Sequence, residues 1–272
     1  MAPMTKTIKL VLFDFDGTLA DTLPLSFSAF KAVFKQFGDQ DLTNEDIVAM
    51  FGPTEDDIIR RNIPAGHSAE EAIRRYYAVY ENGHRDGTMT GDSDVAALLD
   101  ILRGKGIAMG VITGKSRRAY DISVEALNIA DCFAISVTGD DVDKPKPDPE
   151  GILLALGKLG ASPAETVFIG DSNADILAGK AAGVRTFGVR WLSTFQSAQY
   201  DAEPDGLFSS TAEFLQLLNA EVPAAAVPDA FLRPGLTKRS VAPGFLYLPT
   251  HAFDSTKKAD GLETQPTALL FL

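Results

Sequence analysis

Residues 8–19 read IKLVLFDFDGTL, an apolar run over residues 8–13 that leads directly into two aspartates and a glycine. A short apolar run followed by turn-forming Asp and Gly is typical of a buried strand that ends in a loop. The sequence therefore predicts a strand with Asp14 and Asp16 just beyond its carboxyl end.

Four further apolar runs follow along the chain and alternate with helical patterns. The runs cover residues 108–112, 133–137, 166–169 and 186–189. The helical patterns cover residues 95–103, 117–127, 150–159, 174–182 and 210–218. Strands that alternate with helices predict an α/β fold, a doubly wound parallel sheet with helices on both faces.

One connection is far longer than the ~2–6 residues usual between a strand and the next helix. Between the first strand and the helix at 95–103, helical patterns cover residues 23–37, 43–50, 55–61 and 68–80. They predict a small α-helical domain inserted as a cap, because ligands of such sheets bind beyond the carboxyl ends of the strands. The predicted domains are a catalytic core of residues 1–20 and 92–219, a cap of residues 21–91 and a C-terminal tail of residues 220–272.

The composition excludes several classes of protein. A net charge of −12 argues against a nucleic-acid surface, which needs clustered Lys and Arg. The single cysteine, Cys132, cannot form an intramolecular disulfide. The N-terminus does not resemble a signal peptide, and no run reaches the ~18 apolar residues of a membrane-spanning helix. We expect a soluble cytoplasmic protein that binds neither nucleic acid nor membranes.

Polar residues that can carry chemistry stand just after four of the predicted strands. They are Asp14, Asp16, Thr113, Lys144, Asp171 and Asp175. Because parallel strands of one sheet end at the same edge, these side chains should converge there.

This set of residues suits phosphoryl transfer. Clustered carboxylates need a cation, and hard oxygen ligands favour magnesium. One carboxylate could attack phosphorus and form an acyl phosphate, while a carboxylate two residues away protonates the leaving oxygen and then activates water. Thr113 and Lys144 could stabilise charge on the transferred group. The predicted substrate is a small phosphorylated metabolite.

The motifs together closely resemble the haloacid dehalogenase superfamily. They are Phe13-Asp14-Phe15-Asp16-Gly17-Thr18-Leu19, Thr113, Lys144 and Gly170-Asp171-Ser172-Asn173-Ala174-Asp175, in the family's order. The resemblance covers about residues 8–218 and implies a Rossmann-like core with the first strand central. It also implies Asp14 as nucleophile and Asp16 as acid/base. Magnesium would be held by Asp14, the Asp16 backbone carbonyl and Asp171, with Asp175 in support.

The resemblance extends to the helical insert, whose position is similar to that of the cap in the phosphoglycolate phosphatase branch. The loop with Thr54 and Glu55 would then face the site and could bind a polar leaving group. Thr113, Gly114 and Lys144 would bind the phosphate. Two lysines remain open as additions: Lys146 is the alternative to Lys144, and Lys115 could approach the phosphate.

Three other functions remain as alternatives to a phosphatase. A phosphosugar mutase of the β-phosphoglucomutase type would share every core motif and differ only in the cap. A phosphoacceptor signalling domain would also cluster aspartates on a doubly wound sheet, but it would not need the large insert. A former enzyme that only binds phosphate compounds would be expected to lack some of the catalytic residues, all of which are present here.

Overall fold

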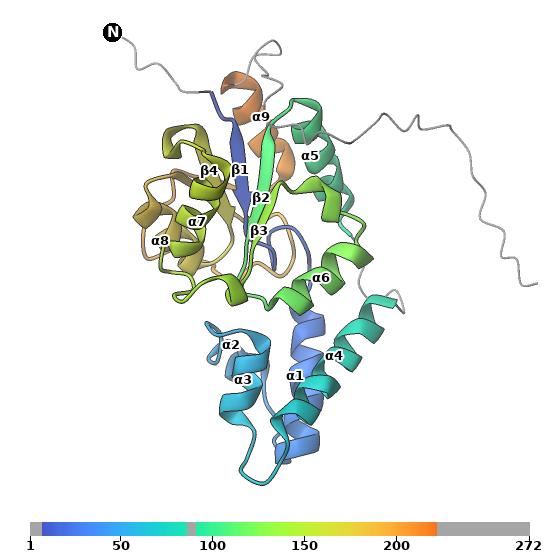
Figure 1. Cartoon of the computed structure of the whole chain (residues 1–272). Coiled ribbons are helices and arrows are strands. Elements are labelled where there is room, and N and C mark those ends of the chain that lie inside the picture. Colours follow the sequence, from blue (N-terminus) through green and yellow to red (C-terminus); the bar gives the residue numbers. More distant parts are fainter. Residues whose placement is uncertain (1–6, 86–90, 222–272) are drawn as a thin grey trace, which may run out of the picture. The chain divides into compact units, whose positions relative to one another are not determined.

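Six parallel strands form one sheet in the order β3-β2-β1-β4-β5-β6 in the computed structural model, which describes residues 7–85 and 91–221 (Figure 1). The strands are β1 (Leu10–Phe13), β2 (Ala108–Ile112), β3 (Ile135–Val137), β4 (Thr166–Gly170), β5 (Arg185–Val189) and β6 (Gly206–Phe208). Leu10 is in register with Ala108 on one side and with Thr166 on the other, so β1 lies inside the sheet. The predicted Rossmann-like parallel sheet with a central first strand is confirmed. Strand β6 was not predicted, because three residues are too few to show a period.

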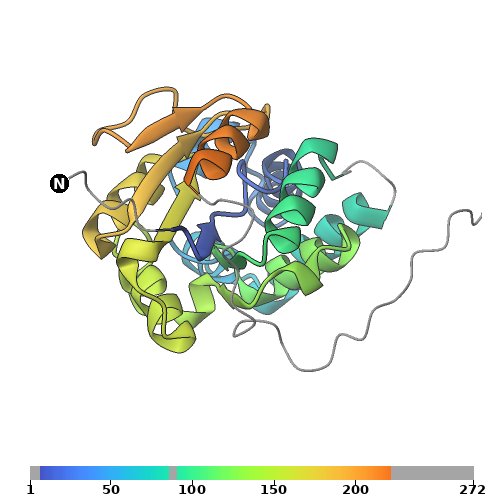
Figure 2. The same ribbon diagram turned by 90° about the horizontal axis from the view of Figure 1, so that it is seen from above.

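Helices cover both faces of this sheet (Figure 2). One layer contains α5 (Ser93–Gly104), α6 (Arg117–Ala126) and α9 (Thr211–Glu221), and the other contains α7 (Glu150–Leu159) and α8 (Asn173–Ala182). Val11 and Phe13 of β1 pack into the first layer, while Leu10 and Leu12 pack into the second. Burial on both faces explains why β1 reads as a continuous apolar run instead of an alternating one.

The insert between β1 and α5 is helical, as predicted. It contains α1 (Leu23–Gly38), α2 (Asn44–Val48), α3 (Glu55–Asn62) and α4 (Ala69–Arg85). These helices lie beyond the carboxyl ends of the strands (Figure 1). Aromatic side chains of α1 and α4 pack together, with ring centroids of Phe30 and Tyr76 4.7 Å apart. The insert therefore has apolar packing of its own, next to the edge of the sheet where the predicted site lies.

None of the helices within residues 7–85 and 91–221 is both long enough and apolar enough to cross a membrane. The predicted tail, residues 220–272, lies outside the described residues except for Ala220 and Glu221, which close α9.

We predict that a chain ending at Glu221 folds and keeps its activity. Helix α9 must stay, because Phe214 and Leu218 are fully buried and Arg185 forms two hydrogen bonds, of 2.9 and 2.7 Å, with Glu221. The shortened chain should unfold within about 3 °C of the full chain in a thermal melt. A chain ending at Ser210 is the control and should be much less stable, since each buried apolar side chain contributes about 1.5–3 kcal/mol. Loss of folding on cutting at Glu221 would contradict the prediction.

Candidate active site

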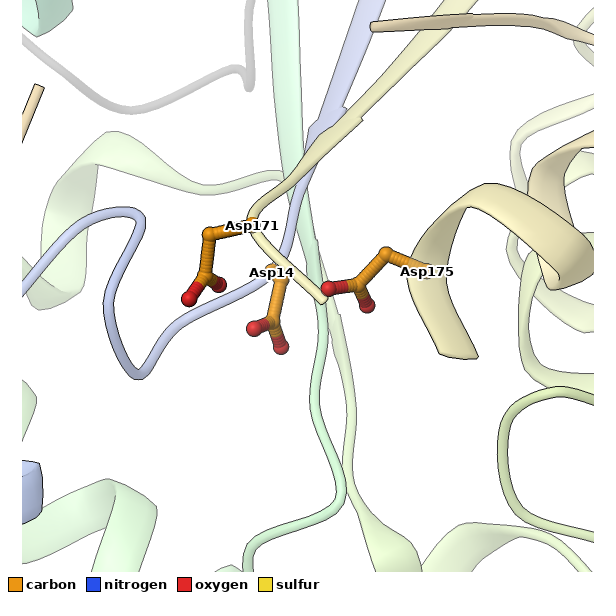
Figure 3. Close-up of side chains that lie close together, drawn as sticks. All are labelled: Asp14, Asp171 and Asp175. Atoms are coloured by element: carbon orange, nitrogen blue, oxygen red, sulfur yellow. The ribbon is translucent and has the colours of Figure 1, made fainter. Parts of the chain in front are cut away.

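Asp14 is fixed at the end of the central strand. Its backbone N–H donates to the carbonyl of Ile169, 2.8 Å away, and so extends the pairing of β1 with β4. Its carboxylate is buried next to those of Asp171 and Asp175, and one oxygen from each of the three lies within 4.8 Å of the others (Figure 3). The structure thus brings together three of the four predicted carboxylates.

Gly17 allows Asp171 to approach the first loop. Its φ is +79°, and a Cβ atom there would lie 2.3 Å from an oxygen of Asp171. The next residue, Thr18, donates its hydroxyl to the other oxygen of Asp171 at 3.0 Å. The Asp-Gly-Thr sequence after β1 therefore has a direct structural reason: Gly17 makes room for the carboxylate of Asp171, and Thr18 orients it.

Asp175 is held by the start of α8. Ser172 is the N-cap residue, and its backbone N–H and hydroxyl both donate to Oδ2 of Asp175, at 2.9 and 2.6 Å. This capping box leaves Oδ1 free to face Asp14 and Lys146. Gly170 has no Cβ for a related reason, because one would lie 2.4 Å from the side chain of Asp175.

The lysine beside the carboxylates is Lys146, not the predicted Lys144. Its Nζ lies 2.6 Å from Asp14 Oδ1 and 2.5 Å from Asp175 Oδ1, and it also donates to the carbonyl of Ile112. Lys144 is exposed, and its backbone N–H donates to Glu150 at the start of α7. That anchor fixes the register of the Lys-Pro-Lys-Pro loop (residues 144–147), so Lys146 reaches the site and Lys144 does not.

Burial and mutual repulsion shift the pKa values in this cluster. Burial, helped by the nearby Asp175, raises the pKa of Asp14 to about 7 although Lys146 opposes the shift. Burial also raises the pKa of Asp171 well above its usual range, and the charges of Asp14 and Asp175 add to it. Burial disfavours the ammonium of Lys146, but the carboxylates of Asp14 and Asp175 outweigh this and raise its pKa. Lys146 contacts Asp14 and Asp175 but not Asp171, so the cluster has more carboxylates than ammonium groups and would be stabilised by a further cation.

The cluster fits a divalent metal ion. All three side chains are carboxylates, are buried and present oxygens to one another, as a hard cation requires. Asp16, also predicted as a ligand, is not part of this side-chain cluster, so only its backbone carbonyl, which the family resemblance implied, is left for that role.

Asp16 instead faces a buried lysine. Lys115 Nζ lies 3.1 Å from Asp16 Oδ1, and the hydroxyl of Thr22 donates to the same oxygen. Lys115 also lies 3.4 Å from Glu55 Oε1 of α3 and 4.9 Å from the centre of the Tyr80 ring. Burial disfavours its charge, but Asp16, Tyr80 and Glu55 raise its pKa well above the usual range. Lys115 therefore connects Asp16 to the helical insert.

A cavity of about 330 Å³ opens between these groups and the insert. Asp14, Asp16, Thr113, Gly114 and Lys146 line its floor. Thr113 continues the pairing of β2 with β3 through a 2.9 Å bond from its N–H to the carbonyl of Val137. The predicted phosphate-binding residues thus share one cavity, with Lys146 in place of Lys144.

The two predicted residues of the insert have different positions. Glu55 lines the cavity, and its Oε2 accepts the N–H of Ser116 at 2.6 Å. Thr54 does not line the cavity within the part of the chain that the structure describes; its methyl group lies over Gly139, where a Cβ would be 2.7 Å away. Thr54 is the N-cap residue of α3, so the direction of the helix turns its side chain away from the cavity.

Some residues of the site gave no recognisable signal in the sequence. Gln196 lines the cavity and donates its backbone N–H to Asp171 Oδ2 at 2.7 Å, but it lies in an irregular segment after β5. Thr22 stands at the start of the insert, and its hydrogen bond to Asp16 is not signalled by any local sequence pattern. Lys115 carried a weak signal, since it follows Thr113 and Gly114 at the end of β2.

The family model of the haloacid dehalogenase-like hydrolases matches residues 11–189. The chain belongs to this family. The match runs from β1 to β5 and includes the insert, Lys146 and the three clustered carboxylates, so the enzyme is a hydrolase with the family's fold.

The chain is similar to a pyrophosphatase and to solved structures that hold phosphate or a sugar bisphosphate. A protein of Bacillus velezensis named pyrophosphatase PpaX is 34% identical over 217 residues, which cover 78% of this chain and 97% of the relative. The crystal structure of CbbY from Rhodobacter sphaeroides in complex with phosphate has a TM-score of 0.68 and 26% identity, over 76% of this chain and 96% of that chain. A mutant of CbbY is described in complex with xylulose-1,5-bisphosphate, with the same TM-score of 0.68. The enzyme is thus a phosphatase-type hydrolase.

We predict that the affinity for Mg²⁺ rises with pH. Asp14 has a folded-state pKa of about 7, raised from 3.8, so in the metal-free protein its contribution to stability is complete below about 3.8 and is lost as the pH rises through about 7. A metal ion must displace this proton, and the raised pKa of Asp171 acts in the same direction, so the affinity should increase by about tenfold or more per pH unit below 7. Titration calorimetry with Mg²⁺ between pH 5.5 and 8 checks this prediction. The same titration with Ca²⁺ repeats the check with a second cation. An affinity for Mg²⁺ that does not change with pH would contradict the raised pKa of Asp14.

Proposed function

We propose that the enzyme is a magnesium-dependent phosphatase that hydrolyses a small phosphate monoester through an aspartyl-phosphate on Asp14. The observation that carries the proposal is the position of Asp14: a buried carboxylate on the cavity floor, next to two further carboxylates and to the Lys146 ammonium.

In the first half of the reaction, a carboxylate oxygen of Asp14 attacks phosphorus. The bond between phosphorus and the ester oxygen breaks, and Asp16 gives its proton to the departing alkoxide. Both contacts of Asp16 among the described residues use Oδ1, which leaves Oδ2 for the proton. The products of this half are an alcohol and the phosphorylated Asp14.

In the second half, Asp16 takes a proton from a water molecule that attacks the same phosphorus. The bond between the Asp14 oxygen and phosphorus breaks, which releases phosphate and restores both carboxyl groups to their starting state. Lys146 and Thr113 line the same cavity as Asp14, and the ammonium and the hydroxyl can donate to the phosphoryl oxygens as charge develops on them.

Asp14 and Asp171 would hold the magnesium ion, with Asp175 in support. When bound, the ion would offset the charge of the carboxylates and of the phosphate, so that two anions can approach each other. Gln196 and Thr18 hold both oxygens of Asp171 in place for this role.

The test is to trap the intermediate. The enzyme is mixed with an aryl phosphate and Mg²⁺, quenched, and treated with borohydride, which reduces an aspartyl phosphate to homoserine. We expect mass spectrometry to find homoserine at position 14. A sample quenched without substrate is the control. Release of phosphate with no modification at position 14 would refute the covalent route, and formation of an isomer from a sugar 1-phosphate without release of phosphate would indicate the mutase instead.

A further inference from the structure

The wall of the cavity opposite the phosphate site is mostly apolar. It is formed by the insert, through Leu23, Phe30, Phe51, Pro53 and Ile58. Ser26 and Glu55 are the polar side chains of this wall among the residues that the structure describes. Because the insert faces the sheet edge that would hold the phosphate, this wall is where the leaving group of the ester has to lie.

Neither lysine of the cavity is free to bind a second anion. Lys146 is shared by Asp14 and Asp175, at 2.6 and 2.5 Å. Lys115 is shared by Asp16 and Glu55, at 3.1 and 3.4 Å. Each ammonium already faces two carboxylates, and within residues 7–85 and 91–221 no arginine lines the cavity.

The arginines of α3 do not offset the charge of Glu55. Arg60 is exposed and pairs with Glu70 at 3.3 Å, and Arg61 is exposed and lies 3.7 Å from Asp57. Both side chains therefore point to carboxylates outside the cavity. Glu55 remains as a carboxylate on the wall, with Lys115 as its cationic partner.

A leaving group with a negative charge would meet an unfavourable surface here. It would lose water against apolar side chains, approach Glu55, and find no unpaired cation in return. A neutral leaving group with carbon atoms would instead bury apolar area against the same side chains. The volume of about 330 Å³ is near the lower end for ligand sites, so phosphate and leaving group together must be small.

We propose that the substrate is a monoester of a small uncharged alcohol that is at least partly apolar, without a second phosphate or a carboxylate. This specificity rests on the proposed phosphatase function. It differs from what the names of two relatives state, since pyrophosphate and xylulose-1,5-bisphosphate both carry a second phosphate group.

The experiment compares substrates that are matched in shape and differ in charge. Isobutyl phosphate and 2-phosphoglycolate have the same branching, but the first carries two methyl groups where the second carries the two oxygens of a carboxylate. With Mg²⁺, we expect kcat/KM for isobutyl phosphate to exceed that for 2-phosphoglycolate and for pyrophosphate by about tenfold or more. The alcohol of 2-phosphoglycolate is the better leaving group, so its intrinsic reactivity works against the expected result.

A substitution in the apolar wall of the cavity provides a second test of the specificity. Phe51 is half-buried at the cavity, and Phe51→Lys would place an unpaired ammonium there, whereas Phe51→Leu is the neutral control. We expect Phe51→Lys to shift the ratio of kcat/KM values toward 2-phosphoglycolate by about tenfold, and Phe51→Leu to leave the ratio in favour of isobutyl phosphate. If Phe51→Lys does not fold, the comparison of substrates on the natural enzyme still decides.

The outcomes separate the two proposals. Equal or better hydrolysis of 2-phosphoglycolate or pyrophosphate by the natural enzyme would overturn the specificity and leave the phosphatase function intact. Hydrolysis of none of the three, nor of an aryl phosphate, would overturn the phosphatase function and the specificity with it.

Discussion

Replacement of Asp14 by Asn is expected to lower kcat by about 10⁴-fold or more, because it removes the proposed nucleophile while keeping the shape of the side chain. Asp14 is buried at the end of β1, and its backbone bond to Ile169 does not depend on the side chain. The variant should therefore fold. The measurement is hydrolysis of an aryl phosphate with saturating Mg²⁺, together with the loss of homoserine after borohydride treatment.

The matched control is Asp94→Asn, which makes the same chemical change at an exposed position in the first turn of α5. It should hydrolyse the aryl phosphate at the natural rate. A circular dichroism spectrum and a thermal melt of both variants separate loss of chemistry from loss of fold. An Asp14→Asn enzyme that works at the natural rate would show that another group attacks phosphorus.

Lys146→Met is expected to lower kcat by about 10²- to 10³-fold. The ammonium contacts both Asp14 and Asp175 and lines the cavity, so its loss removes the charge that is proposed to face the transferred phosphate. Methionine keeps the apolar part of the side chain and lacks the terminal ammonium. Kinetics with an aryl phosphate, at several Mg²⁺ concentrations, will show whether the loss lies in turnover or in metal affinity.

Lys144→Met provides a control two residues away in the same Lys-Pro-Lys-Pro loop. Lys144 is exposed and is anchored by its backbone to Glu150, so its substitution should change kcat by less than about twofold. A larger loss from Lys144→Met than from Lys146→Met would mean that the loop adopts the other register during catalysis.

Asp14 and Asp171 could be predicted because each one stands next to an apolar run. Asp14 and Asp171 directly follow β1 and β4, which are neighbours in the sheet, so their convergence follows from parallel topology. Asp175 lies in the first turn of α8, where it completes a capping box with Ser172. Local sequence therefore contains most of the information about this half of the site.

The remaining parts of the site depend on contacts that no local pattern encodes. The two Lys-Pro pairs are alike in sequence, and the choice between Lys144 and Lys146 is made by Glu150, which anchors the loop. The contact of Glu55 with the N–H of Ser116 joins residues 61 positions apart. Whether Thr54 or Glu55 faces the cavity depends on the direction in which α3 begins, which a propensity pattern does not fix.

The position of Asp14 on the central strand also has a consequence for hydrogen exchange and for the evolution of the enzyme. Its amide bonds to Ile169 inside the sheet, so exchange of that proton should require opening of the whole sheet and should be among the slowest in the chain. Phe51 and Glu55 belong instead to the insert, Phe51 between α2 and α3 and Glu55 at the start of α3, and so lie outside the sheet. Mutations in that part can therefore change which alcohol is accepted while the chemical step is inherited unchanged.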